Sequence, residues 1–363
     1  MIQGHGGNIH ALADRLGCRP AEIIDMSSNI NPLGMVPGML AHLERHLDHA
    51  GRLPEVDCRA MIRRMAVLLD LNPRRVLAGN GTTQFIYTAC PALDARQVLI
   101  IGPTYADYSD ACRMHGIEPH YWLLKPQDRF AADLDRLDRA VEGFDLVFIC
   151  NPNNPTGGLI PVEQLRDVCQ NQPRTRFIID ESYLPFAPAK QSRSMAAYGL
   201  ENVIVLWSAS KIFGMPGLRA GFLIARGKTV SRFRHYAQPW SVNSLAQAAI
   251  DFLGRHKEDV ADFVARTAQF LVRERGLFRQ RLQAVEALTI YPSKTSYLLI
   301  RLPRHISAQA LCKTLARERL LIRGCGNFYG LSPWFVRVSL KRAALNQIAA
   351  DRIASAIEEL KGD

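Results

Sequence analysis

Short apolar runs alternate with amphipathic stretches from about residue 51 to about residue 254. The apolar runs lie at residues 75–78, 97–101, 146–150, 176–179 and 203–207, and stretches with helical periodicity, such as residues 162–169, lie between them. This alternation is typical of an α/β domain in which helices cover a mostly parallel sheet. Ligands of such sheets bind outside the carboxyl ends of the strands, and the polar motifs of this chain directly follow its apolar runs.

The pattern changes after about residue 258. A long periodic stretch at residues 260–282 predicts a connecting helix, residues 297–301, 320–323 and 335–338 predict short strands, and residues 308–317 and 345–360 predict helices. We therefore expect a large domain at residues 51–255 and a smaller α+β domain at residues 256–363. Residues 1–50 are too irregular to build a core and are expected to pack against the smaller domain.

Composition and charge narrow the class of partner. The chain has 363 residues, of which 48% are hydrophobic, and a formal net charge of +11. Its basic residues are dispersed and no DNA-reading motif is present, so the charge favours small anionic molecules over nucleic acid. No apolar run is long enough to span a bilayer and no signal peptide is visible, so we expect no membrane contact and a cytoplasmic protein.

The cysteines and histidines predict no metal site. The eight cysteines form no C-x-x-C pair and mostly sit in apolar surroundings, which favours buried, reduced thiols. His42, His46 and His49 have helical spacing but no accompanying carboxylate or cysteine in a ligand pattern. A solvated helix face is therefore the preferred interpretation of these three histidines.

The strongest chemical signal follows the apolar run at residues 203–207. Ser208, Ser210 and Lys211 come directly after it, and Arg219 follows eight residues after the lysine. A lysine at the end of an apolar strand is partly desolvated, which lowers its pKa and favours reaction with an aldehyde. The hydroxyls and the guanidinium form an anion site. A surface lysine is disfavoured because these groups occur together with a glycine turn.

Along nearly its whole length the chain resembles the class I/II aminotransferases of the pyridoxal-phosphate (PLP) fold-type-I superfamily. The resemblance is carried by the Lys211 region and by the motifs GNGTTQ (residues 79–84), GPTYADY (102–108), NPNNPTG (151–157) and IIDESY (178–183). It implies an α/β fold-type-I transferase fold, a PLP cofactor attached to Lys211, and a homodimer.

The same resemblance assigns roles within these motifs. The backbone N–H groups of Gly81, Thr82 and Thr83 are expected to bind the cofactor phosphate at a helix N-terminus, together with Ser208, Ser210 and Arg219. Tyr105 matches the aromatic residue that stacks on the pyridine ring, although a core tyrosine is an alternative. Asn154 and Tyr183 match the partners of the phenolic oxygen. Asp180 matches the partner of the pyridine nitrogen, with a helix cap as its alternative. Lys211, Asp180 and Tyr183 are the expected catalytic residues.

Within the superfamily the chain is similar to the threonine-phosphate decarboxylases, with the histidinol-phosphate aminotransferases as near neighbours. HGGNI (5–9), SSNINPLG (27–34), QPWSVNSLA (238–246) and LIRGCGNFYGL (321–331) carry this similarity. It implies decarboxylation of L-threonine O-3-phosphate, or of L-serine O-phosphate, to an amino-alcohol phosphate for the cobamide nucleotide loop. Transamination is the alternative activity. A non-catalytic sensor is disfavoured because the lysine is present.

The substrate contacts follow from the same similarity. His5, Asn29 and Arg323 are expected near the substrate phosphate, Arg337 at its carboxylate, and Asn154 beside it. Without the resemblance to the family, the preferred interpretation of Arg337 is a strand arginine in a surface ion pair. Three departures from the family pattern are Leu53 for a tyrosine that reaches the partner subunit's cofactor, Gln84 for a glutamate and Ser296 for an asparagine.

Overall fold

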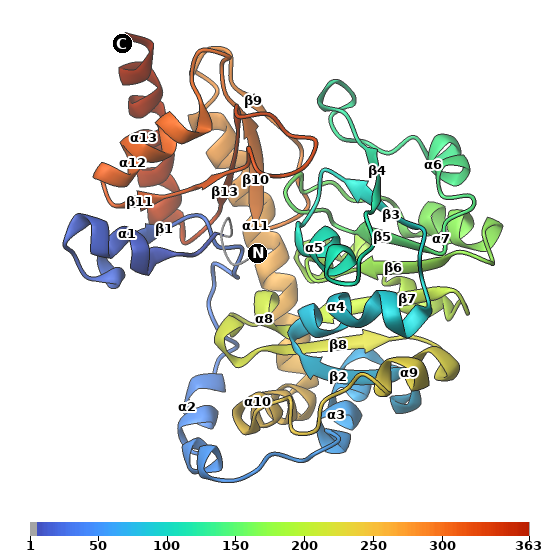
Figure 1. Ribbon diagram of the computed structural model, residues 1–363. Helices are drawn as coiled ribbons and strands as arrows, with labels where there is room; N and C mark the ends of the chain where they lie inside the picture. Colours follow the sequence, from blue (N-terminus) through green and yellow to red (C-terminus); the bar gives the residue numbers. More distant parts are fainter. Residues whose placement is uncertain (1–5, 363) are drawn as a thin grey trace.

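A seven-stranded sheet is the largest sheet of the computed structural model, which describes residues 6–362. In Figure 1 it lies in the part of the molecule that includes α3 (Arg59–Leu69), α4 (Gly81–Leu93) and α7 (Val162–Asn171). Its strand order is β2-β8-β7-β6-β5-β3-β4, and only β8 runs antiparallel to its neighbours. The strands are β2 (Val76–Asn80), β3 (Val98–Gly102), β4 (His120–Leu123), β5 (Leu146–Cys150), β6 (Arg176–Asp180), β7 (Val203–Ser208) and β8 (Ala220–Ile224). The predicted mostly parallel α/β sheet is confirmed.

The five predicted apolar runs became β2, β3, β5, β6 and β7. Every residue of β3, β5 and β7 is buried, which is why these strands are apolar without alternation. Helix α4 (Gly81–Leu93) packs on β2, β7 and β8 and against α5 (Asp107–Met114) and α9 (Gly227–Arg234). Helices α6 (Leu134–Ala140) and α7 (Val162–Asn171) pack together beside β5 and β6.

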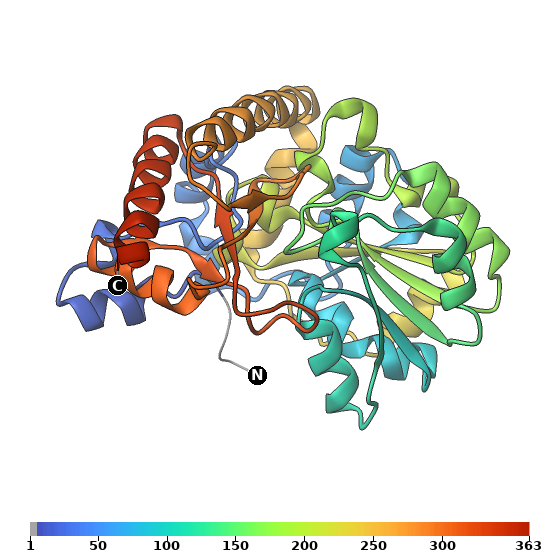
Figure 2. The same cartoon turned by 90° about the horizontal axis from the view of Figure 1, so that it is seen from above.

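A second, four-stranded antiparallel sheet lies apart from the first (Figures 1 and 2). Its order is β12-β13-β10-β9, with strands β9 (Thr289–Ile290), β10 (Tyr297–Arg301), β12 (Arg323–Gly324) and β13 (Phe335–Ser339). Helices α12 (Ala308–Arg317) and α13 (Ala343–Gly362) pack against each other, and the long helix α11 (Lys257–Arg281) packs on α13. In Figure 1, α11 extends from this sheet towards the large one.

Residues 6–50 contact both parts of the molecule. Strand β1 (Ile24–Asp25) pairs in parallel with β11 (Leu320–Leu321), and α1 (Ile9–Leu16) shares a small apolar cluster with α12. By contrast, α2 (Met39–Glu44) contacts α10 (Ser244–Arg255). The single strand predicted at residues 320–323 is divided into β11 and β12, which belong to different sheets. The domain boundaries at residues 51 and 256 stay a prediction.

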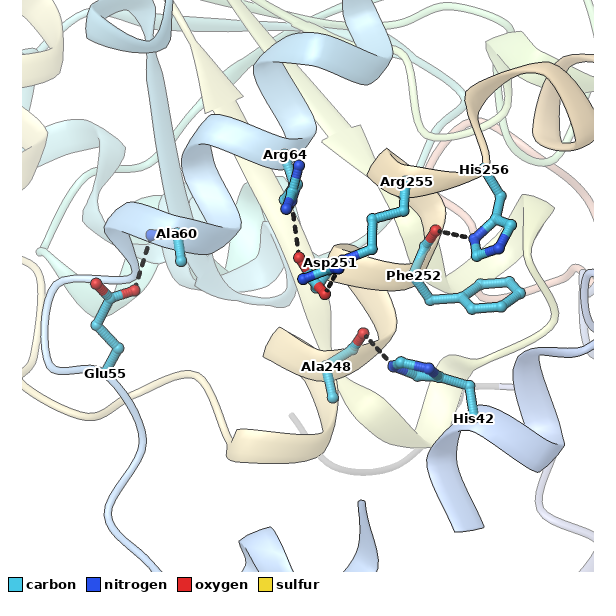
Figure 3. A network of polar contacts seen from close by, with 9 residues as sticks. All are labelled: His42, Glu55, Ala60, Arg64, Ala248, Asp251, Phe252, Arg255 and His256. Atoms are coloured by element: carbon cyan, nitrogen blue, oxygen red, sulfur yellow. Dashed lines mark hydrogen bonds and ion pairs between the residues drawn. The ribbon is translucent and has the colours of Figure 1, made fainter. Parts of the chain in front are cut away.

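Helix α10 makes the polar contacts drawn in Figure 3 with α2 and α3. These contacts correct the prediction that His42, His46 and His49 form a solvated helix face. Asp251 accepts hydrogen bonds from Arg64 Nε on α3 (Arg59–Leu69) at 2.7 Å and from Arg255 Nε at 2.6 Å. His42 Nε2 lies 3.2 Å from the Ala248 carbonyl oxygen, and its ring packs 5.1 Å from that of Phe252. Burial lowers the pKa of His42. The three histidines do not form a solvated helix face, because α2 ends at Glu44 and His42 packs inward.

The described part of the chain contains eight free thiols, and all except Cys18 and Cys312 are buried. Within residues 6–362 no three histidine, cysteine or acidic side chains gather as a metal-ligand set. Over the same residues, no helix has the length and apolar character needed to cross a membrane.

Candidate active site

A small cavity lies where β5, β6 and β7 end and α4 begins, at the sheet edge where the motifs were expected to converge. Its volume is about 120 Å³. The structure brings together here every residue that the sequence assigned to the cofactor, and adds three that it did not. The lining residues are Gly81, Thr82, Thr83, Tyr105, Tyr108, Cys150, Asn154, Asp180, Ser182, Tyr183, Ser208, Ser210, Lys211 and Arg219.

Lys211 enters this cavity from α8 (Ala209–Ile212), a single turn that follows β7. Burial lowers the pKa of Lys211 to about 8, and the positive charges of Arg219 and Arg337 act in the same direction. A lysine with this pKa has a much larger neutral fraction at pH 7 than an exposed lysine has, and a neutral amine is the form that reacts with an aldehyde.

Asp180 is the last residue of β6 and is buried. Its Oδ2 accepts a hydrogen bond from the Tyr108 hydroxyl at 2.8 Å, and its Oδ1 accepts one from the Ser182 N–H at 2.9 Å. Burial raises the pKa of Asp180, whereas the Ser182 and Tyr108 donors and the charge of Lys211 oppose that rise. The carboxylate is therefore anchored at both oxygens beside Lys211 and suits a cationic partner in the cavity.

The turn from β2 into α4 forms the anion-binding end of the cavity. Gly81 has a φ of +72°, and a Cβ at this position would lie 2.6 Å from Arg219 Nη2. The Gly81 N–H donates to the Arg219 carbonyl at 2.8 Å, because the β2–β8 pairing extends one residue into the helix. The prediction that this N–H binds phosphate is therefore corrected. Thr82 and Thr83 remain as first-turn donors, for which the helix itself supplies no acceptor.

Gly221 on β8 supports this turn and was missed by the sequence reasoning. A Cβ at Gly221 would lie 2.2 Å from the Thr82 nitrogen and 2.3 Å from the Gly81 carbonyl carbon. Only glycine therefore allows β8 to approach the backbone of the anion-binding turn so closely. The available signal was a glycine inside an apolar strand two residues after Arg219.

A larger cavity of about 460 Å³ adjoins the first, since Tyr105, Asn154, Tyr183 and Lys211 line both. Its other walls come from the N-terminal segment and the four-stranded sheet. They include Gly6, Gly7, Ser27, Ser28, Asn29, Arg323, Asn327, Phe328 and Arg337. Of the residues assigned to the substrate, Asn29, Asn154, Arg323 and Arg337 meet in this cavity, and His5 lies outside the described residues.

Two guanidinium groups face this larger cavity. Arg337 on β13 is buried and donates through Nη2 to the Ser27 carbonyl at 2.6 Å and through Nη1 to Asn154 Oδ1. Its buried Nε has no hydrogen-bond partner among the described residues, so the surface ion-pair alternative is wrong. Arg323 donates through Nη2 to Asn327 Oδ1 at 2.8 Å and lies 5.3 Å from the centre of the Phe328 ring.

Asn29, which was predicted at the substrate, lies in the wall between the two cavities. Asn29 is buried and donates through Nδ2 to the Tyr183 hydroxyl at 3.2 Å. Of the three departures from the family pattern, Gln84 accepts the Asn80 N–H at 2.7 Å, Ser296 is buried, and Leu53 is 77% exposed.

An aldehyde cofactor with a phosphate group fits the smaller cavity. Ser210 Oγ is buried there without a hydrogen-bond partner among the described residues. A phosphate oxygen in the cavity would supply the missing partner. The amine of Lys211 suits the aldehyde, and the anchored carboxylate of Asp180 suits a protonated ring nitrogen. A mixed sheet with this site at its edge defines a PLP-dependent enzyme of fold type I.

The family follows from comparison with known proteins. The model of the family "Aminotransferase class I and II" matches residues 21–357, so the chain belongs to this family. A threonine-phosphate decarboxylase of Salmonella typhimurium is 34% identical over 349 residues, covering 94% of this chain and 93% of that protein.

Solved structures of related enzymes are also similar to this chain. The L-threonine-O-3-phosphate decarboxylase from Porphyromonas gingivalis superposes with a TM-score of 0.82 at 28% identity, covering 92% of this chain and 99% of that one. The histidinol-phosphate aminotransferase from Clostridium acetobutylicum superposes with a TM-score of 0.83 at 26% identity, again covering 92% of this chain and 99% of that one. The predicted family, fold class and PLP dependence are confirmed.

Proposed function

We propose that this enzyme decarboxylates L-threonine O-3-phosphate to 1-amino-2-propanol phosphate. The observation that carries the proposal is the pair of guanidinium groups, Arg323 and Arg337, in one cavity that adjoins Lys211. A substrate with both a phosphate and a carboxylate matches two such groups, because planar guanidinium groups bind both anions bidentately. The 34% identity to the Salmonella typhimurium threonine-phosphate decarboxylase supports the same reaction.

The cofactor is held by residues of the smaller cavity. When bound, PLP supplies an electron sink for the electron pair released from a bond at the substrate Cα. In this proposal Lys211 carries the cofactor, Asp180 keeps its ring nitrogen protonated, and Tyr105 stacks on the ring. Asn154 and Tyr183 bind the phenolic oxygen. Thr82, Thr83, Ser208, Ser210 and Arg219 bind the phosphate, and Gly81 shapes the turn.

The substrate is oriented by residues of the larger cavity. Arg337 Nε, which has no partner within residues 6–362, is a buried donor for the substrate carboxylate, and Arg323, with Asn29 and His5, receives the phosphate. Both anions are then fixed, which sets the orientation of the bonds at Cα. Once carbon dioxide has left, Cα requires a proton, and the amine of Lys211, which is free again once the substrate amine has taken its place on the cofactor, would be the acid placed to donate it. With a pKa lowered to about 8, its ammonium releases a proton readily.

Product analysis separates decarboxylation from the alternative, transamination of the histidinol-phosphate type. The purified holoenzyme is incubated with L-threonine O-3-phosphate, L-serine O-phosphate and the two free amino acids, with and without 2-oxoglutarate. We expect carbon dioxide release from the phosphorylated amino acids, independent of 2-oxoglutarate. Because one methyl group contributes only about 1–3 kcal/mol of discrimination, serine phosphate is expected to be a poorer substrate that still reacts. Oxo-acid formation that requires 2-oxoglutarate would replace the proposal with the aminotransferase activity.

The phosphate contact is tested in the same assay with Arg323→Ala. This variant is expected to lose activity on phosphorylated threonine by about 100-fold, since the substrate phosphate loses its charged partner. Equal activity of the wild type on free threonine, or an unchanged rate in the variant, would contradict the assigned phosphate site.

We also propose a cytoplasmic homodimer with domains at residues 51–255 and 256–363. The eight cysteines form no disulfide within the described residues and most are buried, which supports an intracellular location. Support for the dimer comes from large apolar side chains that are exposed around α2 and the approach to α10, namely Leu40, Leu47, Leu53, Val56 and Trp240. The segments that carry Leu40 and Leu47 both contact α10, and Ser244 of α10 donates to the Arg52 carbonyl. Exposed apolar side chains on adjacent segments are typical of a protein interface.

A further inference from the structure

We propose that Tyr108 is a positioning residue that holds Asp180 and the ring of Tyr105 in place for the cofactor. The inference rests on the proposed role of Asp180 and adds a residue that no family motif assigned. It is drawn from three contacts of one side chain: with the carboxylate, with the stacking aromatic ring and with the core beneath them.

The hydroxyl of Tyr108 connects α5 to the end of β6. It donates to Asp180 Oδ2 at 2.8 Å, while Oδ1 accepts from the backbone N–H of Ser182. Each carboxylate oxygen therefore has one fixed donor on the protein side. Two donors from different directions prevent the carboxylate from rotating, so its remaining lone pairs face the cavity.

Burial and two aromatic contacts fix the ring of Tyr108. The residue is completely buried, its ring stacks on Phe148 of β5 at 5.0 Å with an interplanar angle of 12°, and it meets Tyr105 edge to face at 5.8 Å. Tyr105 thus rests against a ring that cannot move without displacing the core. One side chain therefore links the group expected at the cofactor's nitrogen with the group expected on its face.

The Tyr108 hydroxyl stabilises the ionised form of Asp180. Burial raises the pKa of Asp180, so each hydrogen bond to the ionised form counters protonation. Burial also raises the pKa of Tyr108 well above its ordinary value, so the hydroxyl keeps its proton and always acts as a donor. The other titratable groups that face Asp180 are Tyr105, Cys150, Glu181, Tyr183 and Lys211.

Tyr108→Phe is the test variant because it removes the hydroxyl and keeps the ring. Loss of a hydrogen bond to a charged group is expected to reduce kcat by about 10-fold to 100-fold. The acid limb of the kcat profile should move to higher pH, because an Asp180 with one donor fewer is protonated more easily. KM for L-threonine O-3-phosphate should change by less than about twofold, since Tyr108 does not line the larger cavity.

A double-mutant cycle shows whether Tyr108 acts through Asp180. In the Asp180→Asn background, Tyr108→Phe should change kcat and the PLP dissociation constant, measured by equilibrium dialysis, by less than about twofold. In the wild-type background the same change should weaken PLP binding by about 10-fold. Tyr236→Phe is the matched control, because it removes an exposed hydroxyl that donates to the Pro91 carbonyl at 3.1 Å, remote from the site.

The outcomes separate the inference from the proposed function. Equal losses in both backgrounds with an unmoved acid limb would overturn the inference and make Tyr108 a residue of stability alone. An Asp180→Asn enzyme with near wild-type kcat and PLP binding would instead overturn the role of Asp180 on which the inference rests. The thermal unfolding midpoint of the cofactor-free variants confirms that each one is folded.

Discussion

At the scale of single residues, burial makes the charge of Lys211 unfavourable before any cofactor is bound. Its pKa is about 8 in the folded chain, against an ordinary value of 10.5. Between these two pH values the unfolded chain binds the additional proton, so the free energy of unfolding of the cofactor-free protein rises with pH. Below pH 8 the ionised amine therefore destabilises the fold relative to a neutral side chain.

This residue-scale effect is tested by comparing cofactor-free wild type with Lys211→Met in denaturant unfolding. The variant should be the more stable protein at pH 7, and the wild type should gain up to about 3 kcal/mol relative to it as the pH rises from about 8 to about 10.5. A difference between the two proteins that stays constant across this range would show that Lys211 titrates normally in the folded state.

The sequence identified most residues of the site, because they lie in short motifs through which the chain resembles a known family. It failed where a role depends on a neighbour distant in the chain. The Gly81 N–H is engaged by Arg219 because β2 pairs with β8, and no local pattern reveals that pairing. Tyr108 lies in a quoted motif, yet its link to Asp180 spans 72 residues.

At the scale of elements, the closeness of β8 to the start of α4 makes Gly221 sensitive to any side chain. Gly221→Ala places a Cβ 2.2 Å from the Thr82 nitrogen, so the anion-binding turn must shift. We expect PLP affinity, measured by equilibrium dialysis, to fall by at least about 10-fold, which corresponds to one displaced charge-assisted hydrogen bond. The cofactor-free protein should also unfold at a lower temperature.

Gly217→Ala is the matched control for this change. Gly217 lies four residues earlier, and a Cβ there would meet no atom within 4 Å. Its PLP affinity should equal that of the wild type. If Gly221→Ala bound PLP as tightly as this control, the account of β8 as the support of the turn would be wrong.

The strands show where the hydrophobic pattern is sufficient to predict an element from the sequence. Buried parallel strands are continuous apolar runs, and all five predicted runs became strands. Strand β4 was missed because its residues are partly exposed at the sheet edge, which makes its pattern mixed. Strand β8 was missed because it begins Ala-Gly directly after an arginine with φ of +58°, and its antiparallel direction follows from distant pairing.

At the scale of the whole molecule, the site combines parts that are far apart in the sequence. Arg323 and Arg337 come from the four-stranded sheet, whereas Lys211, Asn154 and Tyr183 come from the segments that follow strands β7, β5 and β6 of the seven-stranded sheet. The resemblance to a family named both arginines in advance as substrate contacts, which composition and periodicity alone did not. The fold then shows that the two arginines line one cavity that adjoins Lys211.

The proposed homodimer is the whole-molecule prediction. Static light scattering should give about twice the chain mass of 40.6 kDa. Leu53→Glu should shift the protein towards the monomer, because Leu53 is 77% exposed and lies in the apolar surface proposed as the interface. Met114→Glu, at a 70% exposed methionine on α5, should leave the mass unchanged. A wild type that is monomeric and fully active would contradict the proposal.

The most direct measurement of the central claim is reduction of the holoenzyme with borohydride, followed by digestion and mass-spectrometric mapping of the modified peptide. Borohydride fixes PLP permanently on the lysine that carries it. The account predicts a yellow protein whose colour is lost on reduction, with one cofactor recovered on Lys211 and none after Lys211→Ala. Recovery of the adduct on any other lysine would contradict the assignment of this cavity as the active site.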